Sequence, residues 1–306
     1  VASCIREPRD GMVVAAGSER ADKARKTVME LLVADQPERD MAHDKSSHLW
    51  DMAELNGVSE SRFPKLEEGR IPLLDDSHVA MSVNLDACIS CGLCVRACRE
   101  VQVNDVIGMS GRGHDSYPTF DMADPMGNSS CVACGECVQA CPTGALMPAA
   151  VTAGDGVGDS KDFDSETVSV CAFCGVGCQI SIKVKDCKVK YVEGINGPAN
   201  EGRLCVKGRF GYDYIHHNHR LTKPLIRRAD APAKGLNVDP GNWQEVFREA
   251  TWDEALDKIT EKFSQHKGDQ FAALASARIT NEDNYLIQKF TRAVMGTNNI
   301  DHCARL

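Results

Sequence analysis

Eight cysteines in the middle of the chain repeat one spacing twice. The two runs are Cys88-Ile-Ser-Cys91-Gly-Leu-Cys94-Val-Arg-Ala-Cys98 and Cys131-Val-Ala-Cys134-Gly-Glu-Cys137-Val-Gln-Ala-Cys141. In each run two residues separate the first three cysteines, so the chain turns and brings successive sulfurs to the same side. Zinc sites are usually built from two separated pairs of ligands, whereas tripled thiolates with an offset fourth cysteine favour a metal–sulfur cluster. Disulfides are rare in intracellular chains, where thiols are kept reduced.

In this spacing the fourth cysteine of each run points to the cluster of the other run. The pattern, which is that of two-cluster ferredoxins, therefore predicts two [4Fe–4S] clusters with exchanged ligands. The first would be held by Cys88, Cys91, Cys94 and Cys141, and the second by Cys131, Cys134, Cys137 and Cys98. Gly92 and Gly135 are expected to let backbone N–H groups approach the sulfurs.

A different cysteine spacing follows further along the chain. The run Cys171-Ala-Phe-Cys174-Gly-Val-Gly-Cys178, together with the distant Cys205, predicts a third [4Fe–4S] cluster, with structural zinc as the alternative. Lys207 is either a solvated surface cation or a fixed positive charge between that cluster and an anionic cofactor. Cys187 lies outside every spacing, and we expect it to be a bystander.

The composition limits the class of protein. The chain has 306 residues, enough for several domains, and contains 15 cysteines, a number typical of cluster ligands. Its net charge of −9 argues against nucleic-acid binding. The sequence has no apolar run long enough to span a membrane and no signal-peptide pattern, so we expect a cytoplasmic protein.

The remaining sequence supplies the elements that must position these cysteines. Residues 18–35 predict an amphipathic helix capped by Ser18, and Asp10-Gly11 predicts a turn between short β segments. Residues 108–130 are rich in Gly, Pro, Asp and Ser and predict a loop. His43 and His48 are expected to be polar surface residues.

The second half of the chain has two further patterns. Alternation of apolar and polar residues predicts a small antiparallel sheet from 167–171, 179–185 and 188–192. Two helices capped by Thr251 and Thr280, with apolar strands at 271–275 and from 299 onwards, predict a parallel βαβ unit. The loop of residues 276–282 would then lie at the carboxyl end of a strand, where ligands bind in open α/β sheets.

Taken together, these motifs resemble the α subunit of the NAD-linked, molybdenum- or tungsten-containing formate dehydrogenases, which belong to the molybdopterin oxidoreductases. The most specific segments are residues 171–178, Gly202-Arg-Leu-Cys205-Val-Lys207-Gly-Arg209 and residues 276–306. The resemblance covers nearly the whole chain. It implies an α+β multidomain protein with a two-cluster ferredoxin-like module, a small antiparallel β domain for a [4Fe–4S] cluster, and the start of an α/β molybdopterin-binding domain.

The resemblance also implies domain boundaries. The expected parts are the end of a [2Fe–2S] domain with a helical connector at 1–77, the two-cluster domain at 78–148, a linker at 149–166, the third cluster domain at 167–225, and the beginning of the pterin-binding domain at 226–306.

Several residues acquire expected roles from the resemblance alone. Cys4 resembles the fourth ligand of a [2Fe–2S] cluster whose other ligands would lie upstream. Lys207 resembles the lysine that assists electron transfer between the third cluster and the pterin, and Arg278 and Asn281 resemble residues near a bis-molybdopterin guanine dinucleotide. The catalytic Cys or selenocysteine and a His would follow residue 306, and Cys303 matches a neighbouring position.

The implied function is the electron-relay portion of a formate dehydrogenase. Electrons from formate oxidation at a Mo or W centre would pass through the [4Fe–4S] clusters to a partner β subunit that binds FMN and NAD, and the reverse direction would serve CO2 reduction. The alternatives are another pterin oxidoreductase, an iron–sulfur subunit of an NADH-linked hydrogenase or respiratory complex, and a ferredoxin-like carrier without catalysis.

Overall fold

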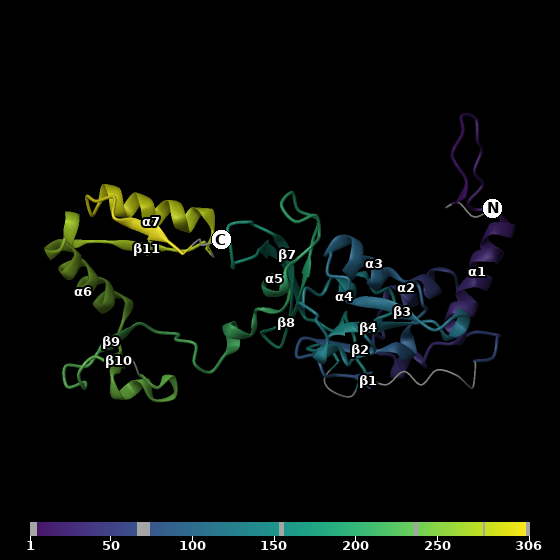
Figure 1. Cartoon of the computed structure of the whole chain (residues 1–306), viewed down its shortest axis with the longest axis horizontal. Coiled ribbons are helices and arrows are strands. Elements are labelled where there is room, and N and C mark those ends of the chain that lie inside the picture. The colour runs from purple at the N-terminus through teal and green to yellow at the C-terminus, as the bar shows by residue number, and fades with distance from the viewer. Residues whose placement is uncertain (1–4, 66–73, 153–155, 236–237, 278, 304–306) are drawn as a thin grey trace. The chain divides into compact units, whose positions relative to one another are not determined.

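The computed structural model describes residues 5–65, 74–152, 156–235, 238–277 and 279–303, shown in Figure 1. It divides into two compact units, Val1–Phe163 and Asp164–Leu306, which are described separately below. Both units mix helices with small sheets, as the sequence predicts. Cys4 and Arg278, two of the candidate site residues, lie outside the described residues. Among the described residues no helix is both long and apolar enough to cross a bilayer.

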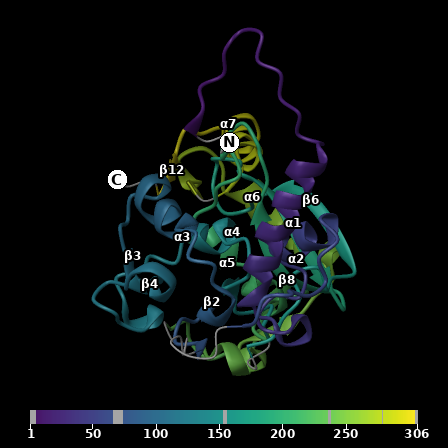
Figure 2. The same ribbon diagram turned by 90° about the vertical axis from the view of Figure 1, so that its right-hand side faces the viewer.

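The first unit begins with two packed helices, α1 (Glu19–Ala34) and α2 (His48–Leu55). The Ser18 side chain accepts a hydrogen bond from the Ala21 amide, so the predicted helix and its cap are confirmed. The two helices lie side by side in Figures 1 and 2 and share a small apolar core. The buried members of this core are Met29, Val33, Leu49, Trp50, Ala53 and Val58.

The segment before α1 differs from the expectation of a β tail. A turn does form at Asp10-Gly11, where the Met12 amide donates to the Arg9 carbonyl over 3.0 Å. However, residues 5–17 contain no strand. An extended segment becomes a strand only where a second segment offers backbone partners, and no such partner pairs with these residues.

The cysteine-rich part of this unit is built from short elements. A three-stranded antiparallel sheet has the order β1 (Leu74–Asp75), β2 (Met81–Asn84) and β5 (Leu146–Pro148). The short helices α3 (Leu93–Arg96) and α4 (Glu136–Ala140) follow the cysteine loops. The predicted loop 108–130 is wrong in its first part, because β3 (Ile107–Ser110) pairs with β4 (Tyr117–Phe120) in a hairpin.

The connector before α2 is anchored by a buried histidine. His43 is 0% exposed, so its predicted place on the surface is wrong, whereas His48 is exposed as predicted. The Nδ1 atom of His43 lies 2.6 Å from the Gly144 carbonyl oxygen, and the Nε2 atom of His43 lies 3.1 Å from Ser82 Oγ. Both ring nitrogens thus have a polar atom within hydrogen-bonding distance, which makes burial of the ring tolerable.

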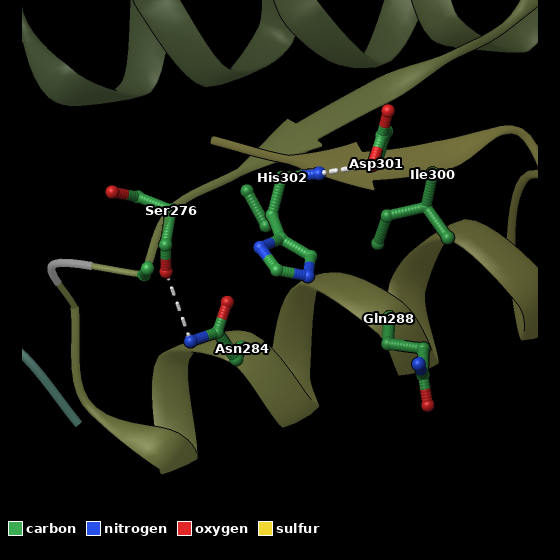
Figure 3. Close-up of a pocket in the computed structure, with 8 residues that line it drawn as sticks. Ser276, Asn284, Gln288, Ile300, Asp301 and His302 are labelled. Atoms are coloured by element: carbon green, nitrogen blue, oxygen red, sulfur yellow. Dashed lines mark hydrogen bonds between the residues drawn. The ribbon is translucent and has the colours of Figure 1, made fainter. Parts of the chain in front are cut away.

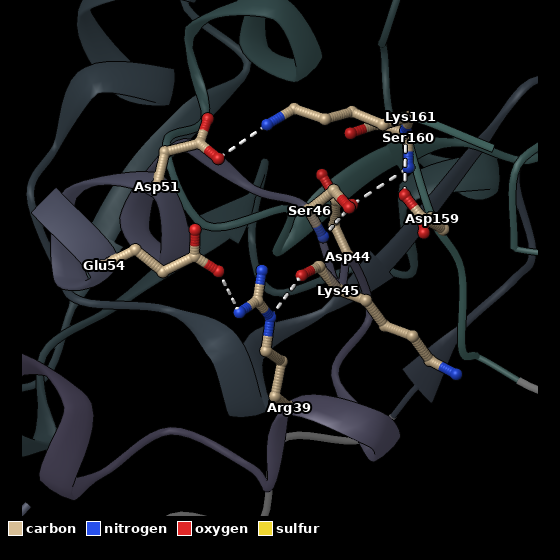
Figure 4. A network of polar contacts seen from close by, with 9 residues as sticks. All are labelled: Arg39, Asp44, Lys45, Ser46, Asp51, Glu54, Asp159, Ser160 and Lys161. Atoms are coloured by element: carbon tan, nitrogen blue, oxygen red, sulfur yellow. Dashed lines mark hydrogen bonds and ion pairs between the residues drawn. The ribbon is translucent and has the colours of Figure 1, made fainter. Parts of the chain in front are cut away.

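The segment predicted as a linker at 149–166 is bonded to this connector where the structure describes it. Asp44 Oδ1 accepts from the Ser160 amide at 3.0 Å, and the Lys45 amide donates to the Gly158 carbonyl at 3.0 Å. Lys161 Nζ also pairs with Asp51 at 2.5 Å. Figure 4 shows how these polar side chains from the two segments face one another.

The second unit opens with the predicted antiparallel sheet, in the order β6 (Ser165–Val170), β7 (Gln179–Lys185) and β8 (Lys188–Gly194). A short helix, α5 (Val206–Phe210), follows Cys205. Buried residues of the sheet and of the segments around α5 form one cluster, made of Cys171, Ile180, Val192, Leu204 and Tyr212.

The rest of this unit contains the predicted βαβ arrangement. An antiparallel pair, β9 (Leu225–Arg227) and β10 (Phe247–Glu249), precedes α6 (Trp252–Gln265). Then β11 (Ala273–Ala275), α7 (Asn281–Ala293) and β12 (Ile300–His302) follow, and β11 pairs with β12 in parallel. Thr251 and Thr280 cap the two helices as predicted, because each hydroxyl accepts from the amide three residues on.

Candidate functional site

The two repeated cysteine loops have the same backbone conformation. Ser90 and Ala133, each just before the second cysteine of its run, have positive φ angles of 54° and 56°. Each also donates its amide to the sulfur of the first cysteine, Cys88 or Cys131, over 3.4 Å. Positive φ is uncommon for residues with a Cβ atom and is typical of backbone held for a function. The repeat in the sequence is therefore a repeat in structure.

Glycines begin the helices that carry the third cysteine of each loop. Gly92 and Gly135 are the N-terminal caps of α3 and α4, with φ of 70° and 74°. Only glycine adopts this conformation without a steric cost. The turn directs the chain so that Cys94 and Cys137, each the second residue of its helix, are buried.

The four cysteines of the first predicted set interact with one another. Burial, together with the nearby thiols of Cys141, Cys88 and Cys91, raises the pKa of Cys94 to about 12. The pKa of Cys91 is also raised, first by burial and then by Cys141. The offset fourth cysteine therefore lies with the first run, as crossed ligation requires.

The second predicted set is grouped in the same way. Burial raises the pKa of Cys137, and the neighbouring thiols of Cys134 and Cys131, followed by those of Cys94 and Cys98, add to the shift. Burial likewise raises the pKa of Cys131, with Cys134 and Cys98 adding to the shift. Buried thiols ionise only where a positive charge compensates them, and a bound metal supplies that charge. The site thus suits a metal–sulfur group, although its occupation stays a prediction.

The described residues form no site of the kind that a single metal ion takes. No group of three or more His, Cys, Asp or Glu side chains in the described ranges converges on one point as a lone ion requires. Zinc takes thiolates at about 2.3 Å. In a cubane each thiolate binds a different iron, so the sulfurs stand further apart.

The third cysteine set lies at the end of the β6–β8 sheet. Cys171 directly follows β6, and its amide donates to the Cys178 carbonyl over 2.8 Å, which closes the loop. Burial raises the pKa of Cys178, and Cys171, Cys174 and Cys205 raise it further. All four predicted ligands therefore interact in one place.

Helix α5 packs closely against this loop because it contains Gly208. A Cβ atom added at Gly208 would lie 3.6 Å from Cys171 Sγ and 3.4 Å from a Leu204 methyl group. At Gly211, just after the helix, a Cβ atom would lie 2.9 Å from the Phe173 ring. The two glycines thus bring the helix and the chain that follows it against the cysteine loop.

One residue of this site was missed by sequence reasoning. Tyr212 is 7% exposed, and its ring packs edge-on against Phe173 with 5.7 Å between centroids. No atom completes a hydrogen bond of normal geometry with its hydroxyl, yet the Cys171 thiol is close enough to contribute, after burial, to a raised pKa of Tyr212. Tyr212 lies seven residues after Cys205, and no ligand pattern uses this separation. The only sequence signal for its place in the site is the preceding Gly211.

The other sequence candidates lie at the surface. Lys207 is exposed in α5, an environment that fits either of its two predicted roles. Cys187 is exposed at the β7–β8 turn, away from the cysteine sets, and Cys303 is exposed with its sulfur 3.4 Å from Ser276 Oγ.

A pocket of about 280 Å³ opens at the carboxyl ends of the parallel strands β11 and β12. Its lining is Ala275, Ser276, Ala277, Asn284, Gln288, Ile300, Asp301 and His302. The Asn284 amide reaches across it and donates to the Ser276 carbonyl at 3.1 Å, as Figure 3 shows. The pocket occupies the position predicted for a ligand, and its polar lining suits a cofactor with many hydrogen-bonding groups.

Asn281 lies beside the third cysteine set and does not line this pocket. A Cβ atom added at Gly175, between Cys174 and Cys178, would be 2.9 Å from Asn281 Oδ1. The start of α7 therefore joins the cysteine loop to the pocket-bearing part of the unit.

Family models match three parts of the chain. Residues 87–145 match a 4Fe-4S dicluster domain, residues 164–217 match a molybdopterin oxidoreductase Fe4S4 domain, and residues 220–306 match a molybdopterin oxidoreductase domain.

Curated relatives align over parts of their own length. "Putative formate dehydrogenase YrhE" of Bacillus subtilis is 30% identical over all of this chain and 34% of its own. "Putative formate dehydrogenase SH0748" of Staphylococcus haemolyticus is 36% identical over 72% of this chain and 25% of its own. "F420-dependent formate dehydrogenase 2 subunit alpha" of Methanococcus maripaludis is 44% identical over 45% of this chain and 18% of its own. The chain thus spans about a third or less of the length of these relatives.

Proposed function

Because the chain carries the iron–sulfur and pterin-domain sequences of the molybdopterin oxidoreductases, we propose that it is the electron-relay portion of a formate dehydrogenase α subunit. The observation that carries this proposal is the presence, on one chain, of three grouped cysteine sets and a polar pocket at the carboxyl ends of parallel strands. A ferredoxin-like carrier would need only the first two sets.

The twelve cysteines are assigned as ligands in the three predicted sets, and Cys4 as a ligand of a [2Fe–2S] cluster. When bound, these clusters would supply one-electron transfer, and a bis-pterin Mo or W centre would supply the two-electron oxidation of formate. The chain's own part is to hold thiolates at fixed separations, to exclude water from Cys94, Cys137 and Cys171, and to donate amide N–H groups to sulfur.

The pterin end is assigned to the loop after β11. Asn281, beside Gly175, and Arg278 are proposed to contact the pterin dinucleotide together with the pocket residues. Lys207 would place its positive charge between the third cysteine set and that anionic cofactor, easing electron transfer. The exposure of Lys207 allows such a contact.

The proposed partner is a cytoplasmic β subunit that binds FMN and NAD. One of the relatives, which is 44% identical over 139 residues, is named as F420-dependent. Its name therefore points to an acceptor other than NAD. The relay can serve either acceptor because the acceptor site would lie on the partner. Assays with both acceptors, using formate and the purified full-length complex, decide which is used.

The first test is the metal content of the full-length protein, purified without oxygen. Three cubanes predict about twelve irons and as many labile sulfides per chain, with about two more for a [2Fe–2S] cluster. One Mo or W per chain is also expected. Zinc at the third set, or no pterin metal in the full-length protein, would contradict the proposal and leave the carrier as the better description.

A matched pair of variants then tests the ligand assignment. Cys171→Ala is expected to lose about four irons and one EPR signal of the reduced protein. Cys187→Ala removes an exposed thiol from the same sheet and should keep all the iron. Equal iron in both variants would contradict the assignment of Cys171.

A further inference from the structure

Tyr212 places an unsatisfied hydroxyl inside the third cysteine site. The residue is 7% exposed, and its oxygen is one of three buried polar side-chain atoms in the described residues without a normal hydrogen bond. A buried hydroxyl that makes no hydrogen bond is costly, and such groups are uncommon in folded proteins. The other two atoms, on Glu30 and Ser47, belong to the first unit and are far in sequence from this site.

The surroundings hold the Tyr212 ring in one position. Phe173, inside the cysteine loop, contacts it edge-on, and Phe173 also contacts Tyr214 edge-on with 5.8 Å between centroids. Gly211 fixes the approach of the chain, because its amide donates to the Lys207 carbonyl over 2.9 Å. The hydroxyl therefore cannot turn to water without repacking the ring.

The group that the hydroxyl meets is sulfur. Cys171, itself buried, packs in one buried cluster with Tyr212, and Cys171 and Cys205 are electrostatic neighbours of the phenol. A phenol carries its proton at neutral pH and can donate one hydrogen bond. A thiolate is an acceptor, and it becomes a stronger one when it carries more negative charge.

We propose that Tyr212 is a positioning residue whose hydroxyl donates a hydrogen bond to the Cys171 thiolate and thereby raises the reduction potential at the third cysteine set. The proposal rests on the proposed function, because it requires that this set holds a cluster. No other polar atom of the described residues is bonded to this hydroxyl. Hydrogen bonds to cluster sulfurs are among the features that set reduction potentials. Reduction adds negative charge at the thiolates, so the bond favours the reduced form.

The chain offers a closely matched pair of variants for the test. Tyr212→Phe removes only the buried hydroxyl. Tyr214→Phe removes a hydroxyl from the second tyrosine that packs against Phe173; Tyr214 is 41% exposed. Both are made in the full-length protein and compared by iron and sulfide content, by an EPR-monitored redox titration, and by pulsed EPR in D2O, which detects exchangeable hydrogens near a cluster.

Tyr212→Phe is expected to keep its iron and to lower the reduction potential of one cluster. At a fixed applied potential, the ratio of reduced to oxidised cluster should be roughly tenfold lower. One exchangeable deuteron coupling should vanish with it. Tyr214→Phe should match the wild type in both measurements. Unchanged potentials and couplings in Tyr212→Phe, with iron retained, would overturn this inference alone. A wild-type protein without iron at the third set would overturn the proposed function instead.

Discussion

His43 Nδ1 lies 2.6 Å from the carbonyl oxygen of Gly144, which follows the last cysteine of the two-cluster module by three residues. A carbonyl oxygen can only accept, so this nitrogen carries a proton and donates it. The ring's Nε2 lies 3.1 Å from the oxygen of Ser82, whose hydroxyl donates to the Asp76 carboxylate. The contact ties the helical connector to the end of the cysteine-rich segment.

The stability of the first unit should depend on pH through His43. Burial lowers its pKa below the ordinary 6.5, although the Gly144 carbonyl and the Asp76 and Asp44 carboxylates act in the opposite sense. The unfolded state therefore takes up a proton at a higher pH than the folded state does. The free energy of unfolding is thus expected to fall as the pH drops below 6.5, as urea denaturation at several pH values would show.

His43→Gln is the variant that isolates this effect. It should reduce the free energy of unfolding by about 1–3 kcal/mol at pH 7.5, because a buried partner loses its hydrogen bond, and it should weaken the dependence on pH. His48→Gln, at an exposed position, should leave both unchanged. If the free energy of unfolding of His43→Gln kept its full dependence on pH, groups other than His43 would be responsible for that dependence.

Two glycine variants should differ sharply in stability. Gly144 has φ of 74°, and an added Cβ atom would lie 2.3 Å from the Cβ atom of Asp44. Gly57 has φ of 64° but nothing within 4 Å of its Cβ position. Gly57→Ala should cost only the backbone strain, about 1–2 kcal/mol. Gly144→Ala should cost about 3 kcal/mol or more because strain and overlap add. Denaturation curves that give similar losses would argue against the close approach.

Asp44 should contribute more stability than the neighbouring ion pair shown in Figure 4. It is 4% exposed, and its Oδ1 accepts from the amides of Ser46 and Ser160, each at 3.0 Å. Asp44→Ala should lower the free energy of unfolding by about 2–3 kcal/mol and speed proteolysis within residues 156–163. Asp51→Ala removes the pair with Lys161, which is exposed to solvent, and should cost less than about 1 kcal/mol. Equal proteolysis of the two variants would contradict this ranking.

Asn284 should control cofactor retention at the pocket. Its amide donates to the carbonyls of Ser276 and Thr280, at 3.1 Å and 3.3 Å, and so holds the loop after β11. Asn284→Ala should lower the Mo or W content of the purified full-length protein several-fold, since the loop loses its hydrogen bonds. Lys289→Ala, on the same helix at an exposed position, serves as the control and should retain the metal. Normal metal content in Asn284→Ala would remove this residue from the site.

The features that the sequence predicted correctly depend on local signals. Ser18, Thr251 and Thr280 each lie directly before an amphipathic helix, and the alternation in residues 179–192 directly reflects a half-buried sheet. The cysteine groups are predictable for the same reason, since three ligands of each set lie within eight residues.

The features that were missed depend on distant partners. The burial of His43 follows from Ser82 and Gly144, which are 39 and 101 residues away. The composition of residues 149–166 suggests a flexible linker, yet its polar groups bond to the connector. Tyr212 enters its site only because the chain bends at Gly211.

The long separation between bonded residues in the first unit has a consequence for the order of folding. Asp44 bonds Ser160 across 116 positions, so the chain must close a long loop before this contact gives any gain. The β2–β5 pairing, in which Val83 lies opposite Leu146, closes a shorter loop. We therefore expect slow folding in which the connector docks last. The cysteines should stay accessible for cluster insertion until the connector has docked. Pulsed hydrogen exchange during refolding should show the Lys45 and Leu49 amides protected after those of β2, and simultaneous protection would exclude this order.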